Sequence, residues 1–531
     1  MLDVVIENGV VIDGSGRPGE PGDVAIGGGK IVAVGRVGHV EAARRLDASG
    51  LVVTPGFVDP HSHTDYTVHA NRTAESTIRQ GVTTEIVGNC GITNAPVSQY
   101  SKSSVVAALA IHGYEGPVSW SSFSEYLEDV ERGGISQNLA WFVGHSAVRG
   151  AAGVRGAQPT EEELAAMEAH VEEAMEAGAL GMSSGLEFRE GRQATSEELE
   201  RLVAVVGRHD GYYASHIRNR DASILEAVDE FLRAIELSGA HGQISHLNVR
   251  LDTGAPPGGW EHAVARMERA RAKGMDIQAD MTPFREGMGD MAGILPPWLM
   301  EKGPAHAAAL LEDGEVRRRA KEDSDRYWRF VHKGQWERVR LHRSKQFPEY
   351  DGMVFPDIAC LRGTDEWTCF FDILQAAGAD MEHMEMVGEL FSPEDLAQQL
   401  KHPLFSCGVD AYSSSVEDTT AGCSPLSFSG HTEYLSVHVR ERKTVSLEEM
   451  IRKLTSLPAS RFGIQGRGRV AKGYFADLVV FDPATVGSES TFARPAVYPS
   501  GIFHVLVNGQ LVVDDQRHTG VRSGRVLRRA A

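Results

Sequence analysis

The sequence lacks several features that define large classes of protein. No run approaches the roughly 18 apolar residues of a membrane-spanning helix, and the first residues do not resemble a secretion signal. Its five cysteines are odd in number and have no Cys-x-x-Cys spacing, so we expect no disulfide framework and a cytoplasmic location. Basic residues are outnumbered, with 53 Lys and Arg against 73 Asp and Glu. The net charge of −20 argues against a nucleic-acid partner, and we expect no membrane partner either.

The sequence does contain enough residues for more than one domain, since 531 exceed what one compact core usually holds. Short apolar runs separated by glycine turns occupy both ends, for example "GDVAIGGGKIVAVG" and "GIFHVLVNGQLVVDD". This shared pattern predicts one small β-sandwich domain formed by both termini, residues 1–54 and 465–531. Residues 55–464 would form a different, central domain.

The central part alternates strand patterns with helical patterns such as "TEEELAAMEAHVEEAMEAG" and "ASILEAVDEFLRAIELSG". The strand patterns cover residues 51–60, 82–89, 139–145, 179–186, 211–217, 242–249, 275–281 and 404–412. Eight such units predict an α/β fold, a (β/α)8 TIM barrel. Residues from about 283 to 403 are too many for a simple crossover and predict an insertion before the last strand, a candidate lid. The strand-like "EHMEMVGEL" inside it leaves the strand count open by one.

Metal-ligating residue types follow most of these strand patterns. In an extended segment, residues i and i+2 share a face, so the two histidines of "DPHSHTD" point the same way. Active sites of such barrels lie at the carboxyl ends of the strands. The residues at those ends are His61, His63, Cys90, His216, His246 and Asp410. Their coincidence at one end of successive strands predicts a transition-metal site.

The motifs "PGFVDPHSHTD", "GVTTEIVGNCG", "SSGLEF", "YYASHIR", "ISHLNV" and "LTSLPASRFGIQGRGRVAKGYFADLVVFDP" resemble the amidohydrolase superfamily, and within it the N-acyl-D-amino-acid deacylase (D-aminoacylase) family. The resemblance extends over nearly the whole chain. It implies a metal-bearing barrel with a tight zinc bound by Cys90, His216 and His246. It also implies a second, weaker position near His61, His63 and Asp410, with Cys90 able to bridge; whether one or two metals act stays open.

These residue types favour metal-assisted hydrolysis of an amide, and the resemblance implies a linear amide in a small-molecule substrate. A thiolate and two imidazoles leave one position open on a tetrahedral Zn²⁺, which can polarise a carbonyl and lower the pKa of a bound water towards about 7. Asp410 is expected to be the catalytic proton shuttle, taking a proton from water and returning it to the leaving nitrogen.

The sequence departs from the family where the resemblance implies contacts to the substrate carboxylate. Asn248 stands where the family usually has lysine, while Phe188 and the Thr282–Phe284 stretch replace tyrosines. The usual His-Pro-Arg stretch after the last strand is also not evident. We therefore expect an altered substrate-binding pocket formed with Asn248, Phe188 and Phe284. The arginines that remain available there are Arg250, Arg285 and Arg189.

Two other interpretations stay open at this stage. A cyclic amide hydrolase of the hydantoinase or dihydroorotase type shares the fold, but such enzymes commonly bridge two metals with a carboxylated lysine on strand four, and "ALGMSSGLEF" has none. A non-catalytic scaffold is the other, although such relatives tend to lose ligands and this sequence keeps all six. His145 and Glu187 are expected at the barrel mouth, with roles in orientation or in structure. The sequence leaves a homo-oligomer open.

Overall fold

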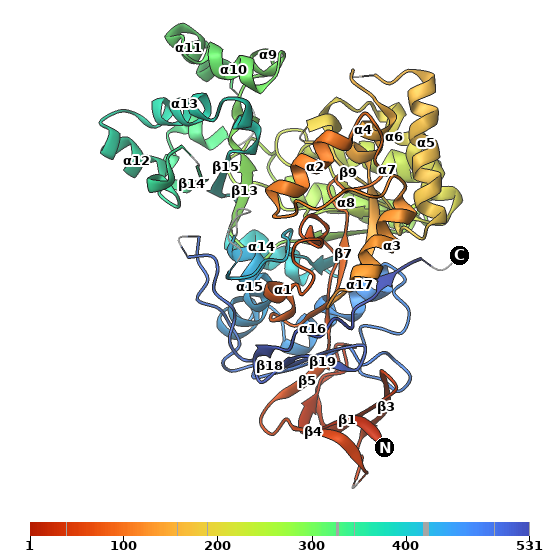
Figure 1. Cartoon of the computed structure of the whole chain (residues 1–531). Coiled ribbons are helices and arrows are strands. Elements are labelled where there is room, and N and C mark those ends of the chain that lie inside the picture. Colours follow the sequence, from red (N-terminus) through yellow and green to blue (C-terminus); the bar gives the residue numbers. More distant parts are fainter. Residues whose placement is uncertain are drawn as a thin grey trace.

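Parallel strands form the centre of the fold (Figure 1), and in the described part of the chain eight of them follow one another in one sheet. They are β6 (Phe57–Asp59), β7 (Val82–Val87), β8 (Asn138–Gly144), β9 (Gly181–Gly185), β10 (Tyr212–His216), β11 (His241–Ile244), β12 (Ile277–Met281) and β16 (Phe405–Cys407). Beyond the two end strands, Asp410 N donates to His61 O and His63 N donates to Ala411 O, which joins the last strand segment to the first. Each predicted strand pattern overlaps one of these strands, and the TIM-barrel prediction is confirmed.

The structure is a computed structural model and describes residues 1–529 except 39, 157, 188, 325–328, 345, 418–423 and 493. None of the helices in this described part of the chain combines the length and apolar character that crossing a bilayer requires.

Helices cover the outside of the barrel and bury its strands. Every residue of β7 and β8 is buried, as expected for parallel strands with both faces covered. The main covering helices are α3 (Phe123–Gly133), α4 (His145–Ala152), α5 (Glu161–Glu176), α6 (Ser196–Arg208), α7 (Ile224–Ser238), α8 (Gly259–Ala272) and α16 (Leu447–Leu454). Helix α5 begins where predicted because Thr160 and Glu163 form a reciprocal capping box that satisfies its first free N–H groups.

Both ends of the chain contribute to a second sheet of nine strands. These are β1 (Leu2–Val11), β2 (Glu20–Gly27), β3 (Lys30–Gly35), β4 (Ala42–Asp47), β5 (Val52–Pro55), β17 (Leu478–Phe481), β18 (Ile502–Val507), β19 (Gln510–Asp514) and β20 (Arg517–His518). Strand β5 pairs antiparallel with β17, so the two termini meet in one sheet. Strand β1 pairs with β2, β4 and β5, and this branching encloses an apolar core of its own. The divisions at residues 54 and 464 stay predictions.

The predicted insertion lies between β12 and β16 and projects from the barrel (Figure 1). Its antiparallel sheet consists of β13 (Glu286–Asp290), β15 (Glu385–Glu389) and β14 (Val339–Arg343). The strand-like "EHMEMVGEL" thus supplies β15, and the barrel keeps eight strands. Helices α9 (Pro297–Met300), α10 (Pro304–Leu310), α11 (Gly314–Asp323), α12 (Phe355–Arg362) and α13 (Glu366–Ala377) complete the insertion, and α14 (Pro393–Lys401) leads to β16. That the insertion acts as a lid stays a prediction.

Candidate metal centre and active site

Three of the predicted ligands converge from three different strands. Cys90 follows β7, His216 ends β10 and His246 follows β11. The Sγ atom of Cys90 lies 3.9 Å from His216 Nδ1 and 3.5 Å from His246 Nε2. All three side chains are buried and their ligand atoms lie within 4.8 Å of one another. With a metal–sulfur bond of about 2.3 Å and a metal–nitrogen bond of about 2.05 Å, a tetrahedral zinc site separates sulfur and nitrogen by about 3.6 Å. The observed spacing fits such an ion.

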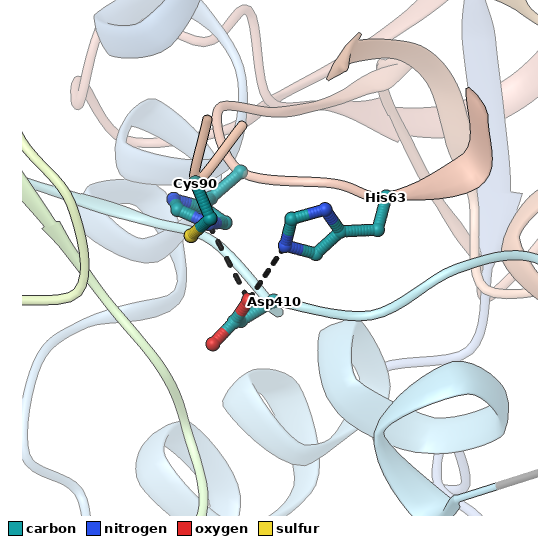
Figure 2. Close-up of side chains that lie close together, drawn as sticks. His63, Cys90 and Asp410 are labelled. Carbon is teal, nitrogen blue, oxygen red and sulfur yellow. Dashed lines mark hydrogen bonds and ion pairs between the residues drawn. The ribbon is translucent and has the colours of Figure 1, made fainter. Parts of the chain in front are cut away.

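A second group shares Cys90 and lies beside the first. Asp410 Oδ1 lies 3.1 Å from His63 Nε2 and 3.4 Å from His61 Nε2, while Cys90 Sγ lies 3.4 Å from the same His61 nitrogen. Figure 2 shows His63 and Asp410 pointing toward each other, with the Cys90 side chain directed at the same space. The structure therefore brings all six predicted residues together in two sets that meet at one thiol. One side of this centre is open, because about 34% of the Asp410 side chain is exposed.

The backbone is strained at the residues that carry these ligands. Cys90, His246 and Asp410 have φ values of 53°, 33° and 59°, in the left-handed region that non-glycine residues rarely adopt. Such strain persists where surrounding structure enforces it, and it is frequent at functional sites. Gly91 allows the turn at Cys90 to approach β9 closely, because a Cβ atom there would lie 2.8 Å from Gly185 N.

The charges of the centre favour a bound cation. Burial opposes ionisation of the Cys90 thiol, but His61, His216 and His246 hold its pKa well below the usual range. Burial likewise opposes ionisation of Asp410, yet His246 and His61 keep the pKa of this carboxyl low. Although burial disfavours a charged His63, Asp410 and Cys90 raise its pKa to about 10. The same negative groups that draw protons onto these imidazoles would stabilise a divalent metal in their place.

The outer nitrogen of His216 is held by Glu187, from the loop after β9. Glu187 Oε2 lies 2.7 Å from His216 Nε2, and Arg250 donates to both oxygens of this carboxylate. Arg220 lies on the same side, 3.5 Å from Glu187 Oε2 and 2.9 Å from His246 Nδ1. A carboxylate bound to the outer nitrogen of a metal-ligating histidine fixes the ring and raises its basicity. Glu187 thus has the orienting contact considered for it from the sequence, whereas the contacts of Arg220 were not anticipated.

Asp280, on β12, is a buried carboxylate that the sequence argument missed. Its Oδ1 accepts a 2.6 Å hydrogen bond from His246 N and lies 3.3 Å from His61 Nδ1. One carboxylate therefore contacts a histidine of each of the two residue sets. The available signal was an aspartate near the end of an otherwise apolar strand, "MDIQADM".

Comparison with known proteins shows the family of this chain. The model of the Amidohydrolase family matches residues 44–331 and 426–513, more than half of the chain.

The chain belongs to the amidohydrolase family.

Within this family the chain is similar to N-acyl-D-amino-acid deacylases. It is 33% identical to N-acyl-D-glutamate deacylase of Alcaligenes xylosoxydans xylosoxydans, covering 100% of this chain and 97% of that protein. It is 32% identical to D-aminoacylase of the same organism, covering 100% and 98%. A solved N-acyl-D-glutamate deacylase from Bordetella bronchiseptica, complexed with zinc and a phosphonate mimic of the tetrahedral intermediate, has a TM-score of 0.81 and 30% identity over 99% of both chains.

A solved D-aminoacylase with a binuclear metal centre also has a TM-score of 0.81, at 29% identity over 100% of both chains. The predictions of a D-aminoacylase-like family, a metal-dependent amidohydrolase and a small-molecule substrate agree with these matches. The L-hydantoinase of Arthrobacter aurescens, at 16% identity and a TM-score of 0.57 over 100% of both chains, shares the fold. Strand β9 of this amidohydrolase, "GMSSG", has no lysine of the kind that commonly bridges two metals in cyclic amide hydrolases.

The described residues among those predicted to bind substrate contact other residues of the protein. Asn248 is fully buried, donates to Gln399 Oε1 at 3.0 Å and accepts from Thr282 N at 3.4 Å. Arg285 forms an ion pair with Glu389 on β15, and Phe284 packs beside an apolar cluster that contains Val409 and Ala411. Arg250 is committed to Glu187 instead of projecting as a separate cation. Phe188 and the side chain of Arg189 lie outside the described residues, and a role for any of these residues in substrate binding stays a prediction.

His145, the other residue expected at the barrel mouth, has structural contacts. His145 begins α4, and its Nε2 lies 2.7 Å from Glu198 Oε1, which also accepts from Arg149. All three side chains are buried, so His145 belongs to an ion-pair cluster between α4 and α6.

Proposed function

We propose that this amidohydrolase is a zinc-dependent hydrolase of a linear amide, acting as an N-acyl deacylase. The observation that carries the proposal is the convergence of Cys90, His216 and His246 beside the open carboxylate of Asp410. A thiolate with imidazoles is a ligand set that suits zinc. The chemistry also matches the names of the relatives, which are deacylases of N-acyl-D-amino acids.

Zinc held by these residues would polarise the amide carbonyl and lower the pKa of a bound water towards about 7. Asp410 supplies the proton transfer. Its Oδ1 faces His61 and His63, whereas Oδ2 lies 3.8 Å from His246 Nε2 and the carboxylate is partly open to solvent. In our proposal this carboxylate accepts a proton from the attacking water and passes it to the nitrogen of the leaving amine. His61 and His63 hold the carboxylate in place for both transfers.

The substrate we propose is less anionic than a simple N-acyl amino acid. Glu187 neutralises Arg250, Glu389 pairs with Arg285, and Asn248 replaces a cation with a buried amide. A substrate carboxylate on this side would have to displace Glu187 or remain unpaired, which costs binding energy. A neutral N-acyl amine, or one whose charge lies far from the scissile bond, avoids that cost.

Kinetics on a matched pair of amides test the proposal. N-acetyl-D-methionine and the N-acetyl derivative of the corresponding neutral amine differ in the carboxylate alone. We expect hydrolysis of the neutral compound and weak or no hydrolysis of the amino acid. A kcat/KM of about 10⁴ M⁻¹s⁻¹ or more on N-acetyl-D-methionine would contradict the neutral pocket, because this value is typical of efficient enzymes. Loss of that activity in Arg250→Met but not in Arg285→Met would then identify Arg250 as the carboxylate partner.

A further inference from the structure

Helix α2 (Lys102–Ile111) exposes an apolar surface beside the active site. It lies in the loop between β7 and β8 and contacts the protein mainly through Val105 and Leu109. The residues that it leaves exposed are Ser103, Ser104, Val106, Ala107, Ala108, Ala110 and Ile111, together with Lys102 at its start. The exposed fractions of Val106 and Ile111 are 44% and 47%. A helix with apolar residues on its outer side is usually covered by something.

The exposed apolar residues form one continuous face. Val106 and Ala110 are one turn apart, as are Ala107 and Ile111, and residues at this spacing are neighbours on a helix surface. Lys102 is the one charged residue of the helix, at the end remote from Ile111.

A row of rings connects this face to the metal centre. The His63 ring lies 4.9 Å from that of Tyr66, the Tyr66 ring lies 5.2 Å from that of His112, and the His112 ring lies 5.3 Å from that of Tyr412. His112 is the C-terminal cap of α2, and Tyr412 follows Asp410 by two residues. Tyr66, His112 and Tyr412, the aromatic rim, are each half-buried. The rim therefore leads from the reacting groups to the exposed end of α2.

The two sides of the metal centre differ in character. On the side of β9 to β11, Glu187, Arg250, Arg220 and Asp221 form a buried network of ion pairs. On the side of β6 and β7, the aromatic rim and α2 offer aromatic and aliphatic surface. An amide substrate with an apolar part would place that part on the side of β6 and β7. Contact with the ion pairs on the other side would contribute less binding energy.

Two other occupants fit the helix less well. A stable interface between two chains buries about 800 Å² on each partner, whereas α2 has ten residues and is about 15 Å long. A membrane surface with anionic lipids would repel a protein of net charge −20. A flexible apolar chain of a small molecule matches a narrow face that begins at the active site.

We infer that the aromatic rim and the outer face of α2 bind the acyl chain of the substrate, and that the preferred acyl group is a long, unbranched aliphatic one. This inference rests on the proposed deacylase function. Fission of the amide bond by water would then release a fatty acid from the side of α2 and the amine from the opposite side.

Hydrolysis of three amides tests the inference. They share one amine that lacks a carboxylate and carry an acetyl, an octanoyl or a dodecanoyl group. We expect kcat/KM to rise at least about 10-fold from acetyl to dodecanoyl, because each methylene on the rim and helix adds buried apolar area. Val106→Ser and Ile111→Asn should bring the ratio of dodecanoyl to acetyl kcat/KM towards one. Leu237→Asn is the matched control, since Leu237 is an exposed leucine (58%) on α7, and its ratio should equal that of the wild type. An unchanged ratio in both α2 variants, or equal activity on all three acyl groups, would overturn the inference.

Direct binding separates this inference from the proposed function. A fluorescent dodecanoyl amide should bind the wild-type protein and the Leu237→Asn variant at least about 10-fold more tightly than Ile111→Asn, even if no amide is hydrolysed. Binding that is equal in all three proteins would overturn the acyl-chain site. So would a wild-type dimer that Val106→Ser and Ile111→Asn convert to monomers, or sedimentation with phosphatidylcholine vesicles that both variants abolish.

Discussion

Glu187 Oε2 lies 2.7 Å from His216 Nε2, so a carboxylate fixes the ring whose other nitrogen faces the Cys90 thiol. Arg250 binds the same carboxylate through both of its oxygens. Burial opposes ionisation of Glu187, but Arg250 and His216 hold its pKa well below the usual range. The glutamate thus stays charged and orients His216 Nδ1 toward the Cys90 thiol and the proposed metal position.

Replacing this carboxylate should weaken metal binding without removing a ligand. Glu187→Gln is expected to lower zinc affinity by about 10- to 100-fold, since an amide supports the imidazole less well. Competition with a chromophoric chelator measures the affinity. Glu172→Gln is the matched control, because Glu172 Oε1 makes a similar 2.6 Å contact with His209 Nε2 on the outside of the barrel. Equal zinc affinity in wild type and Glu187→Gln would show that this contact is structural.

Asp410→Asn should separate metal binding from catalysis. Asparagine keeps the shape of the side chain but cannot accept and return a proton, so the hydrolysis rate should fall by about 10²-fold or more. Zinc at Cys90, His216 and His246 should remain. The test combines metal analysis with single-turnover rates on the same preparation. A near wild-type rate in the variant would assign the proton transfer to another group.

Placing a lysine at position 248, where the family usually has one, should not create a binding site for the substrate carboxylate. Asn248 is fully buried between Gln399 and Thr282 N, so Asn248→Lys would place an ammonium group where an amide links α14 to the residue after β12. We expect it to destabilise the fold by about 3 kcal/mol or more, visible as a lower thermal midpoint, with no gain on N-acetyl-D-methionine. Asn248→Met separates the effect of charge from that of size. A gain of 10-fold or more in activity would instead show that position 248 faces the substrate.

The strand order and the gathering of six side chains at the strand ends could be predicted from the sequence, but most contacts around these side chains could not. The barrel strands are apolar runs at regular intervals, and the ends of such strands meet at one face. In contrast, Glu187 and Arg250 are 63 residues apart, and Asn248 and Gln399 are 151 apart. Nothing in the local pattern at Asn248 or Arg250 indicates whether the side chain points at substrate or at a neighbouring element. The support of two histidines by Asp280 likewise depends on which strands are adjacent.

Acid should destabilise the protein in part through His431, on α15 (Pro425–Glu433). Burial lowers the pKa of this histidine to about 3, against about 6.5 in an unfolded chain. Below pH 6.5 the unfolded state therefore binds a proton that the folded state does not, and stability falls as the pH is lowered towards 3. The contribution is about 1.4 kcal/mol per pH unit between these values.

Thermal unfolding of His431→Gln tests this contribution. Between pH 6 and pH 4 its midpoint should decline less steeply than that of the wild type. His306→Gln, at an exposed histidine on α10, should follow the wild-type slope. Parallel slopes in wild type and His431→Gln would contradict the assignment.

Metal content measured together with amide hydrolysis tests the central claim most directly. The wild-type protein should contain about one tightly bound zinc per chain, lose hydrolysis when a chelator removes it and regain hydrolysis when zinc is returned. Cys90→Ala should lose both the metal and the activity, whereas Cys369→Ala, which removes a buried thiol of the insertion, should keep both. Full hydrolysis by metal-free protein, or wild-type zinc content in Cys90→Ala, would contradict the account.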